Sequence, residues 1–161
     1  MAVYMVKQVC KSGSCRDGAL ERRQFLQGSL GLFGAVPLCC TTPEIRGASV
    51  RFEGTTLWID LEQAPELHAV GSAVAVVDAS RKLDLIIVHT GKGQFAALDR
   101  SCTHNGAQCT YSHKRRTVQC TSLNHAEYDL AGTLLHGRTH GNLRTYQVRH
   151  AGALIEIRLE V

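Results

Sequence analysis

The chain has 161 residues, with 18 Lys and Arg against 14 Asp and Glu, so its formal net charge is only +4. That length accommodates one domain and an N-terminal extension, and a hydrophobic fraction of 44% is enough for one buried core. The small, mostly scattered excess of positive charge lacks the clustered basic face that DNA or RNA binding requires, so we expect no nucleic-acid partner.

The first 45 residues do not resemble a folded domain. Arg22 and Arg23 precede a Gly-containing apolar run that ends near Leu38. The run is about 15 residues long, shorter than the roughly 20 of a membrane-spanning helix. Twin arginines before such a run are typical of a Tat export signal. We therefore predict a Tat-like signal or anchor over residues 1–45, through which the chain would associate with a membrane. This predicts a periplasmic protein or one on the outer face of the cytoplasmic membrane. The alternative, an ordinary amphipathic helix, would leave it cytoplasmic.

From residue 48 onward, short apolar runs alternate with turns. The predicted strands are 56–61, 72–78, 83–89, 94–98, 117–120, 143–148 and 153–159. The last of them alternates apolar and charged residues, as a half-buried strand does. Short strands at regular spacing predict an all-β sandwich or small barrel over residues 48–161.

Seven cysteines and eight histidines are the unusual part of the composition. Cys102 and His104 form a Cys-x-His pair, and Cys120 and His125 form a Cys-x4-His pair. Thiolate and imidazole are both good ligands of iron and zinc. In a Rieske [2Fe–2S] centre two cysteines hold one iron and two histidines hold the other, which two such loops would supply. A single zinc ion bound by the same four residues is the alternative.

The surrounding sequence resembles the Rieske family. The run from Cys102 to Gly106 is similar to the first ligand loop, C-T-H-x-G, and the run from Tyr128 to Gly132 is similar to the Y/F-D-x-x-G tail. The resemblance covers roughly residues 67–159. It implies a Rieske-like antiparallel β-sandwich, with a small cluster-binding subdomain that carries both ligand loops at its tip. It also supports the four residues above as ligands of a [2Fe–2S] cluster.

The second ligand loop departs from the family pattern. Its spacing is C-x4-H in place of C-x-x-H, and Ala107 and Ser122 occupy the slots where members of bc complexes have a disulfide. We expect no disulfide between the loops, which disfavours a quinol-oxidising bc complex. Cys109 has no obvious partner and is expected to be a small buried hydrophobe.

The residues after His125 bear on the reduction potential. Ala126 and Glu127 stand where high-potential members have a serine hydroxyl, while Tyr128 is retained. Hydrogen bonds to the sulfurs favour the reduced cluster and a nearby carboxylate opposes it. We therefore predict a potential in the lower or middle part of the Rieske range, which is about −150 to +300 mV.

These features favour an electron carrier that is not itself a substrate-converting enzyme. We expect a small subunit or soluble partner of an oxidoreductase, which exchanges electrons with a cytochrome or with an oxidoreductase large subunit. The basic run Lys114–Arg116 between the ligand loops is expected to be a solvated turn, with a docking patch for an acidic partner as the alternative. Two other functions stay open: the ferredoxin component of a cytoplasmic oxygenase system, and a zinc-stabilised binding module without redox function.

Overall fold

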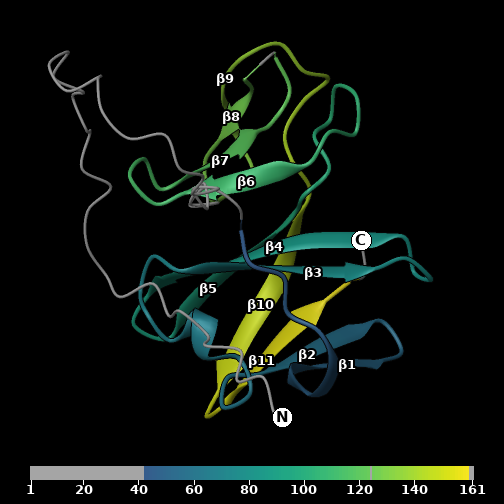
Figure 1. The fold of residues 1–161 in the computed structure, drawn as a ribbon, viewed down its shortest axis with the longest axis vertical. Coiled ribbons are helices and arrows are strands. Elements are labelled where there is room, and N and C mark those ends of the chain that lie inside the picture. Colours follow the sequence, from purple (N-terminus) through teal and green to yellow (C-terminus); the bar gives the residue numbers. More distant parts are fainter. Residues whose placement is uncertain (1–41, 124, 160–161) are drawn as a thin grey trace, which may run out of the picture. The chain divides into compact units, whose positions relative to one another are not determined.

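The computed structural model describes residues 42–123 and 125–159 (Figure 1). The predicted export signal, with Arg22 and Arg23, lies outside these residues. Within the described part, no helix has the length and apolar character needed to cross a membrane.

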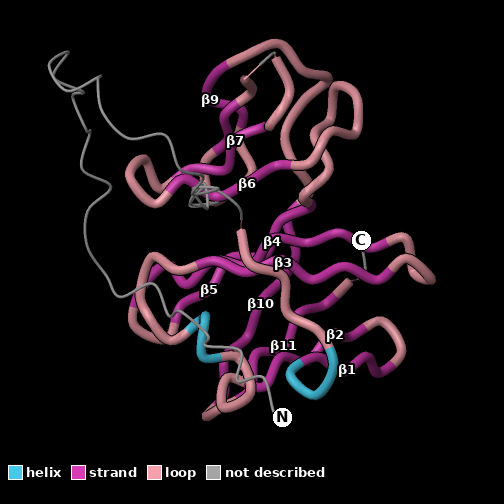
Figure 2. Tube along the Cα trace, viewed as in Figure 1, coloured by secondary structure: helices cyan, strands magenta, loops and turns pink. Residues whose placement is uncertain are grey.

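The described residues form strands joined by loops, with two short 3-10 helices, η1 (Gly47–Ser49) and η2 (Pro65–Leu67) (Figure 2). The strands are β1 (Val50–Glu53), β2 (Thr56–Asp60), β3 (Ala73–Asp78), β4 (Leu83–Gly91), β5 (Gln94–Asp99), β6 (Cys109–Ser112), β7 (Thr117–Cys120), β8 (Glu127–Tyr128), β9 (Leu134–His136), β10 (Thr145–Ala151) and β11 (Leu154–Arg158).

The strands make two antiparallel sheets. The large sheet has the order β1-β2-β11-β10-β5-β4-β3, and the small sheet has the order β6-β7-β8-β9. The small sheet is inserted in the chain between β5 and β10, which are themselves paired. This confirms the predicted all-β class, a Rieske-like antiparallel sandwich with a small subdomain.

Both faces of strand β4 are buried, because the strand lies between two hydrophobic cores. Leu85 and Ile87 point into the first core, which β2 and β11 close from the other side. Ile86 and Val88 point the opposite way, into a second core shared with the small sheet. Since neighbouring side chains alternate between the faces of a strand, burial of both faces explains the unbroken apolar sequence of this strand.

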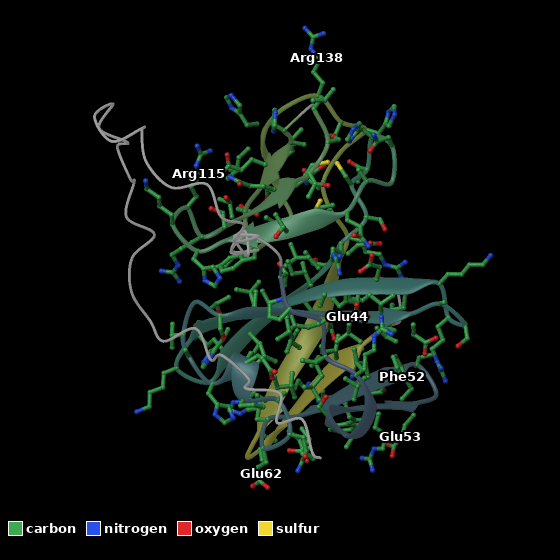
Figure 3. All side chains as sticks on the ribbon, in the orientation of Figure 1. Glu44, Phe52, Glu53, Glu62, Arg115 and Arg138 are labelled. Carbon is green, nitrogen blue, oxygen red and sulfur yellow. The ribbon has the colours of Figure 1, made fainter. Side chains whose placement is uncertain are left out.

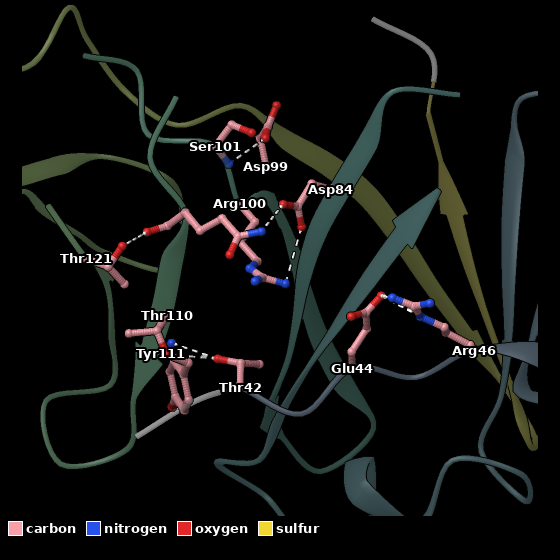
Figure 4. A network of polar contacts seen from close by, with 11 residues as sticks. Thr42, Glu44, Arg46, Asp84, Asp99, Arg100, Ser101, Thr110, Tyr111 and Thr121 are labelled. Atoms are coloured by element: carbon pink, nitrogen blue, oxygen red, sulfur yellow. Dashed lines mark hydrogen bonds and ion pairs between the residues drawn. The ribbon is translucent and has the colours of Figure 1, made fainter. Parts of the chain in front are cut away.

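The residues before position 48 also pack on the domain. Ile45 is buried in the first core, and its backbone N–H donates to the Ala75 carbonyl at 2.9 Å. Thr42 reaches the small sheet, where its hydroxyl accepts a hydrogen bond from the Tyr111 N–H at 3.1 Å (Figure 4). This segment therefore contacts both sheets.

Candidate metal centre

The first candidate ligand loop connects β5 to β6 and closes on itself. The Gly106 N–H donates to the Cys102 carbonyl at 2.9 Å, and the Cys102 N–H donates to the Ala107 carbonyl at 2.8 Å. Gly106 has φ +70°, a conformation that glycine adopts without strain. The backbone thus fixes the direction in which the side chains of Cys102 and His104 leave the loop.

Asp84 of β4 holds both ends of this loop (Figure 4). Before the loop, the Arg100 guanidinium lies 3.4 Å from the Asp84 carboxylate. After it, the Gln108 side-chain amide donates to the same carboxylate at 3.2 Å. Both ion-pair partners are largely buried, with side-chain exposures of 14% and 20%, so solvent weakens this pair less than an exposed one. Asp84 therefore anchors the loop to the large sheet.

The second candidate loop leaves β7 at Cys120 and is tied to the first. The Gln108 carbonyl accepts two hydrogen bonds from Thr121, from its N–H at 3.0 Å and its hydroxyl at 2.8 Å. The loop turns sharply at His125, which has φ +45° and donates its N–H to the Ser122 carbonyl at 3.0 Å. Such a φ is uncommon outside glycine. The extra length of this loop is thus accommodated by a tight turn.

Three cysteine sulfurs meet between the two loops. The Sγ atoms of Cys102, Cys109 and Cys120 all lie within 4.8 Å of one another, and all three residues are buried. All three are free thiols. The sulfur atoms, yellow in Figure 3, gather beside the strands of the small sheet. Cys109 was expected to be buried, and it is, but its closeness to the two candidate ligand sulfurs was not foreseen.

Polar side chains surround these sulfurs. His104 Nδ1 lies 2.8 Å from Cys102 Sγ, and the Tyr128 hydroxyl lies 3.2 Å from the same sulfur. On the other side, the Ser122 hydroxyl lies 3.1 Å from Cys120 Sγ and 3.1 Å from His104 Nε2. Ser122 therefore connects the imidazole of one loop to the sulfur of the other.

Cys109 of β6 and Cys120 of β7 are paired, but their surroundings shift their pKa values in opposite directions. Burial acts to raise the pKa of Cys120, but hydrogen bonds from the hydroxyl and backbone of Ser122, together with contacts to Cys102 and Cys109, outweigh burial and leave the pKa below its ordinary value. Burial raises the pKa of Cys109 strongly, and the adjacent Cys102 and Cys120 add to the effect. Because only the thiolate binds metal, Cys120 is the better prepared ligand of the two.

His125 lies at the surface and is exposed. Together with Cys120 it lines a cavity of about 270 Å³, whose other walls are Arg115, Gln119 and Glu127. The structure thus brings Cys102, His104 and Cys120 to one point and places His125 on a cavity whose lining also includes Cys120.

Glu127, the carboxylate predicted to oppose reduction, is ionised and paired. It accepts a hydrogen bond from the Thr117 hydroxyl at 2.6 Å and forms an ion pair with Arg115 at 3.0 Å. The Thr117 bond is the main cause that lowers its pKa, with Gln119 and Arg115 contributing and burial opposing. Its negative charge is therefore partly balanced by Arg115.

The comparisons with known proteins decide the family. The sequence model of the Rieske [2Fe-2S] domain matches residues 57–147. The chain belongs to the Rieske family. Two solved structures resemble it. One is the plasma membrane Rieske protein of the cyanobacterium Synechocystis PCC 6803, with 25% identity, a TM-score of 0.47, and coverage of 53% of this chain and 85% of that one. The other is the ferredoxin of carbazole 1,9a-dioxygenase from Nocardioides aromaticivorans IC177, with 20% identity, a TM-score of 0.50, and coverage of 63% and 93%. The comparison with curated proteins finds no match.

A Rieske domain carries a [2Fe–2S] cluster, and the donor set of this chain fits one. Two buried thiols from different loops lie close enough to share an iron, and the imidazole of His104 presents Nδ1 to them. The Rieske family works in electron transfer, so this chain is an electron-transfer protein with a redox partner. The predictions of family, cofactor and general function are confirmed.

The contacts that three residues make at the site were missed by sequence reasoning. Ser122 was noted only as a slot without cysteine, yet it contacts both loops. Asp84 belongs to a strand predicted for its apolar residues alone. For Cys109 the sequence does indicate a place near the site, because it is a third cysteine close in sequence to the ligand pairs.

Proposed function

We propose that Cys102 and Cys120 hold one iron of the cluster. His104 and His125 hold the other, and the chain carries single electrons as the small subunit or soluble partner of an oxidoreductase. The observation that carries this proposal is the meeting of the Cys102 and Cys120 sulfurs beside the His104 imidazole. When bound, the cluster accepts and releases one electron at a time.

The residues around the sulfurs set how readily that electron is accepted. Burial and the contact with Cys102 raise the pKa of Tyr128, so its phenol stays protonated and donates to the sulfur. Ser122 donates to the second sulfur in the same way. Nδ1 of His104 faces the Cys102 sulfur, and the Ser122 hydroxyl lies next to Nε2.

The partner docks on the second ligand loop. Leu123, between the two ligands of that loop, is 95% exposed, and Leu135 of β9 is 53% exposed. Solvent-exposed leucines close to a redox centre supply the apolar part of a transient interface. The exposed imidazole of His125 would be the exit for the electron. A cytochrome or an oxidoreductase large subunit fits this role.

The protein works outside the cytoplasm. The support for this is the twin arginine at Arg22 and Arg23, followed by a short apolar run. Tat export suits a chain of this kind, because a folded domain with its cofactor already bound must cross the membrane whole. The predicted location is the periplasm or the outer face of the cytoplasmic membrane.

Spectroscopy of the purified chain tests the metal centre. A brown protein with a rhombic EPR signal after reduction, and two irons and two sulfides per chain, is the expected result. A colourless folded protein with one zinc ion per chain would overturn the proposal and establish the zinc-stabilised module.

Substitution of His125 tests the ligand set. His125→Ala should lose the Rieske visible and EPR spectra. His136→Ala is the matched control, since His136 is an exposed histidine on the neighbouring strand β9 and lies outside the ligand set. Retention of the full spectrum by His125→Ala would show that another group binds the second iron.

Substitution of Leu123 tests the docking site. Leu123→Ser should slow electron exchange with the physiological partner and leave the reduction potential unchanged, because the side chain points into solvent. An unchanged rate would move the partner to another surface.

A further inference from the structure

We propose that Cys109 is a reversible covalent partner of Cys120: in the cluster-free chain, a hydroperoxide joins these two thiols in an internal disulfide. The proposal rests on the ligand role of Cys120 proposed above. It assigns a role to Cys109, which that ligand set does not use.

The register of β6 and β7 places the two cysteines directly opposite each other. Neither N–H bonds to the other residue, since the Cys109 N–H donates to the Arg100 carbonyl and the Cys120 N–H donates to the Ala126 carbonyl. The next bond of the ladder joins the Thr121 N–H to the Gln108 carbonyl, as expected beside a pair that is not hydrogen-bonded.

Pairs of this type are the closest in an antiparallel sheet. Their Cα atoms lie about 4.5 Å apart, which falls within the range of about 4.4–6.8 Å that disulfides span. The two sulfurs already lie within 4.8 Å of each other. A bond between Cys109 and Cys120 therefore needs side-chain rotation and no change of strand register.

A hydroperoxide supplies the oxidising equivalents. It transfers one oxygen to one of the two sulfurs, which gives a sulfenic acid and releases water or an alcohol. The sulfur of the other cysteine then attacks, the S–S bond forms, the S–O bond breaks, and the oxygen leaves as water with the proton of that thiol. The two thiols lose two electrons in total, and the hydroperoxide gains them.

Iron and Cys109 compete for the same sulfur. Cys120 cannot bind iron and belong to a disulfide, so the cluster blocks the bond while it is present. When the cluster is absent, the disulfide protects Cys120 from oxidation to sulfinic and sulfonic acids, which are not reversed by thiol reductants. Reduction of the disulfide restores the ligand. Cys102 is placed differently, because its sulfur contacts the Tyr128 hydroxyl and His104.

Peptide mapping tests the proposal on the full chain. The cluster is removed under reducing conditions, the reductant is exchanged away, and hydrogen peroxide is added. Trypsin releases Cys102 and Cys109 together in residues 101–114 and Cys120 in residues 117–138. The expected product is these two peptides linked, lighter than their sum by two hydrogen atoms, with tandem mass spectrometry assigning the bond to Cys109 and Cys120. The holoprotein should give no such link, and iron and sulfide should rebuild the cluster only after a thiol reductant is added.

Substitution of Cys109 gives the matched control. Cys109→Ser and Cys109→Ala should keep the cluster spectrum, and after removal of the cluster peroxide should oxidise Cys120 to sulfinic or sulfonic acid, with loss of rebuilding. A link between Cys102 and Cys120, a link within residues 101–114, or no link among these three would overturn the proposal, and the wild-type map decides this even if a variant does not fold. A chain purified without any cluster would refute the proposed function, whereas the map reports on the thiol pair alone.

Discussion

Replacing Ser122 with alanine should lower the reduction potential. Its hydroxyl lies 3.1 Å from Cys120 Sγ, and an iron-bound thiolate has no proton, so Ser122 is the donor. Reduction adds negative charge to the sulfurs, which strengthens this bond in the reduced state. We take the gain in hydrogen-bond strength on reduction to equal the usual net contribution of one hydrogen bond, about 0.5–1.5 kcal/mol. Loss of this gain lowers a one-electron potential by about 20–65 mV. Protein-film voltammetry at neutral pH measures this shift.

The neighbouring hydroxyl provides the control. Thr121 donates to the Gln108 carbonyl at 2.8 Å, and among the residues that the structure describes no hydrogen bond joins its hydroxyl to a sulfur. Thr121→Ala should therefore change the potential by less than about 10 mV. An equal fall in the two variants, or an unchanged potential in Ser122→Ala, would refute the assignment of Ser122 as a sulfur donor.

Three further substitutions probe the tuning and stability of the site. Tyr128→Phe removes the hydroxyl 3.2 Å from Cys102 and should lower the potential by a similar amount. In voltammetry the double variant with Ser122→Ala should fall further than either single variant, because the two donors contact different sulfurs. Gly137→Ala would place a Cβ 2.7 Å from backbone of the second ligand loop at φ +98°, so the free energy of unfolding should fall by at least about 2 kcal/mol in urea titrations. An unchanged midpoint would contradict that contact. The Thr117 hydroxyl holds the pKa of Glu127 below its ordinary value of 4.5. The carboxylate therefore stabilises the folded chain above pH 4.5, and this contribution is lost as the pH falls through the lower folded pKa. Glu127→Gln should cost stability in urea titrations at neutral pH and little in strong acid; an equal loss at both would count against the paired carboxylate.

Most strands of the larger sheet could be predicted from the sequence, because β3 and β4 are long apolar runs and β11 alternates apolar and charged residues. The predicted strands 72–78 and 83–89 correspond to β3 and β4, with β4 continuing through an irregularity at His89 to Gly91. The strands β1, β6, β8 and β9 were missed. Each has only two to four residues and mixed polarity, so pairing with a neighbour determines its conformation more than its own sequence does.

The candidate site was predictable only where its chemistry is local. The spacing of Cys102 and His104 is enough to place them together. The link from Ser122 to His104 spans 18 positions and that from Gln108 to Asp84 spans 24, so both depend on how the sheets pack. Cys109 was correctly expected to be buried, but its partner follows from strand register, which the sequence of the turn at 113–116 does not specify.

Because the small sheet is inserted between two paired strands, the part of the chain that carries the candidate ligands can be replaced without changing the pairing of the large sheet. Leu98 of β5 pairs with Thr145 of β10, and the Asp99 N–H donates to the Arg144 carbonyl at 2.8 Å. The chain thus leaves the large sheet and re-enters it at adjacent points, and no described residue in 100–144 belongs to the first core. Segments whose ends meet tolerate replacement and changes of length. A loop can therefore be lengthened, or the reduction potential changed, within this segment while the strands of the large sheet keep their pairing. The longer second ligand loop is one such variation.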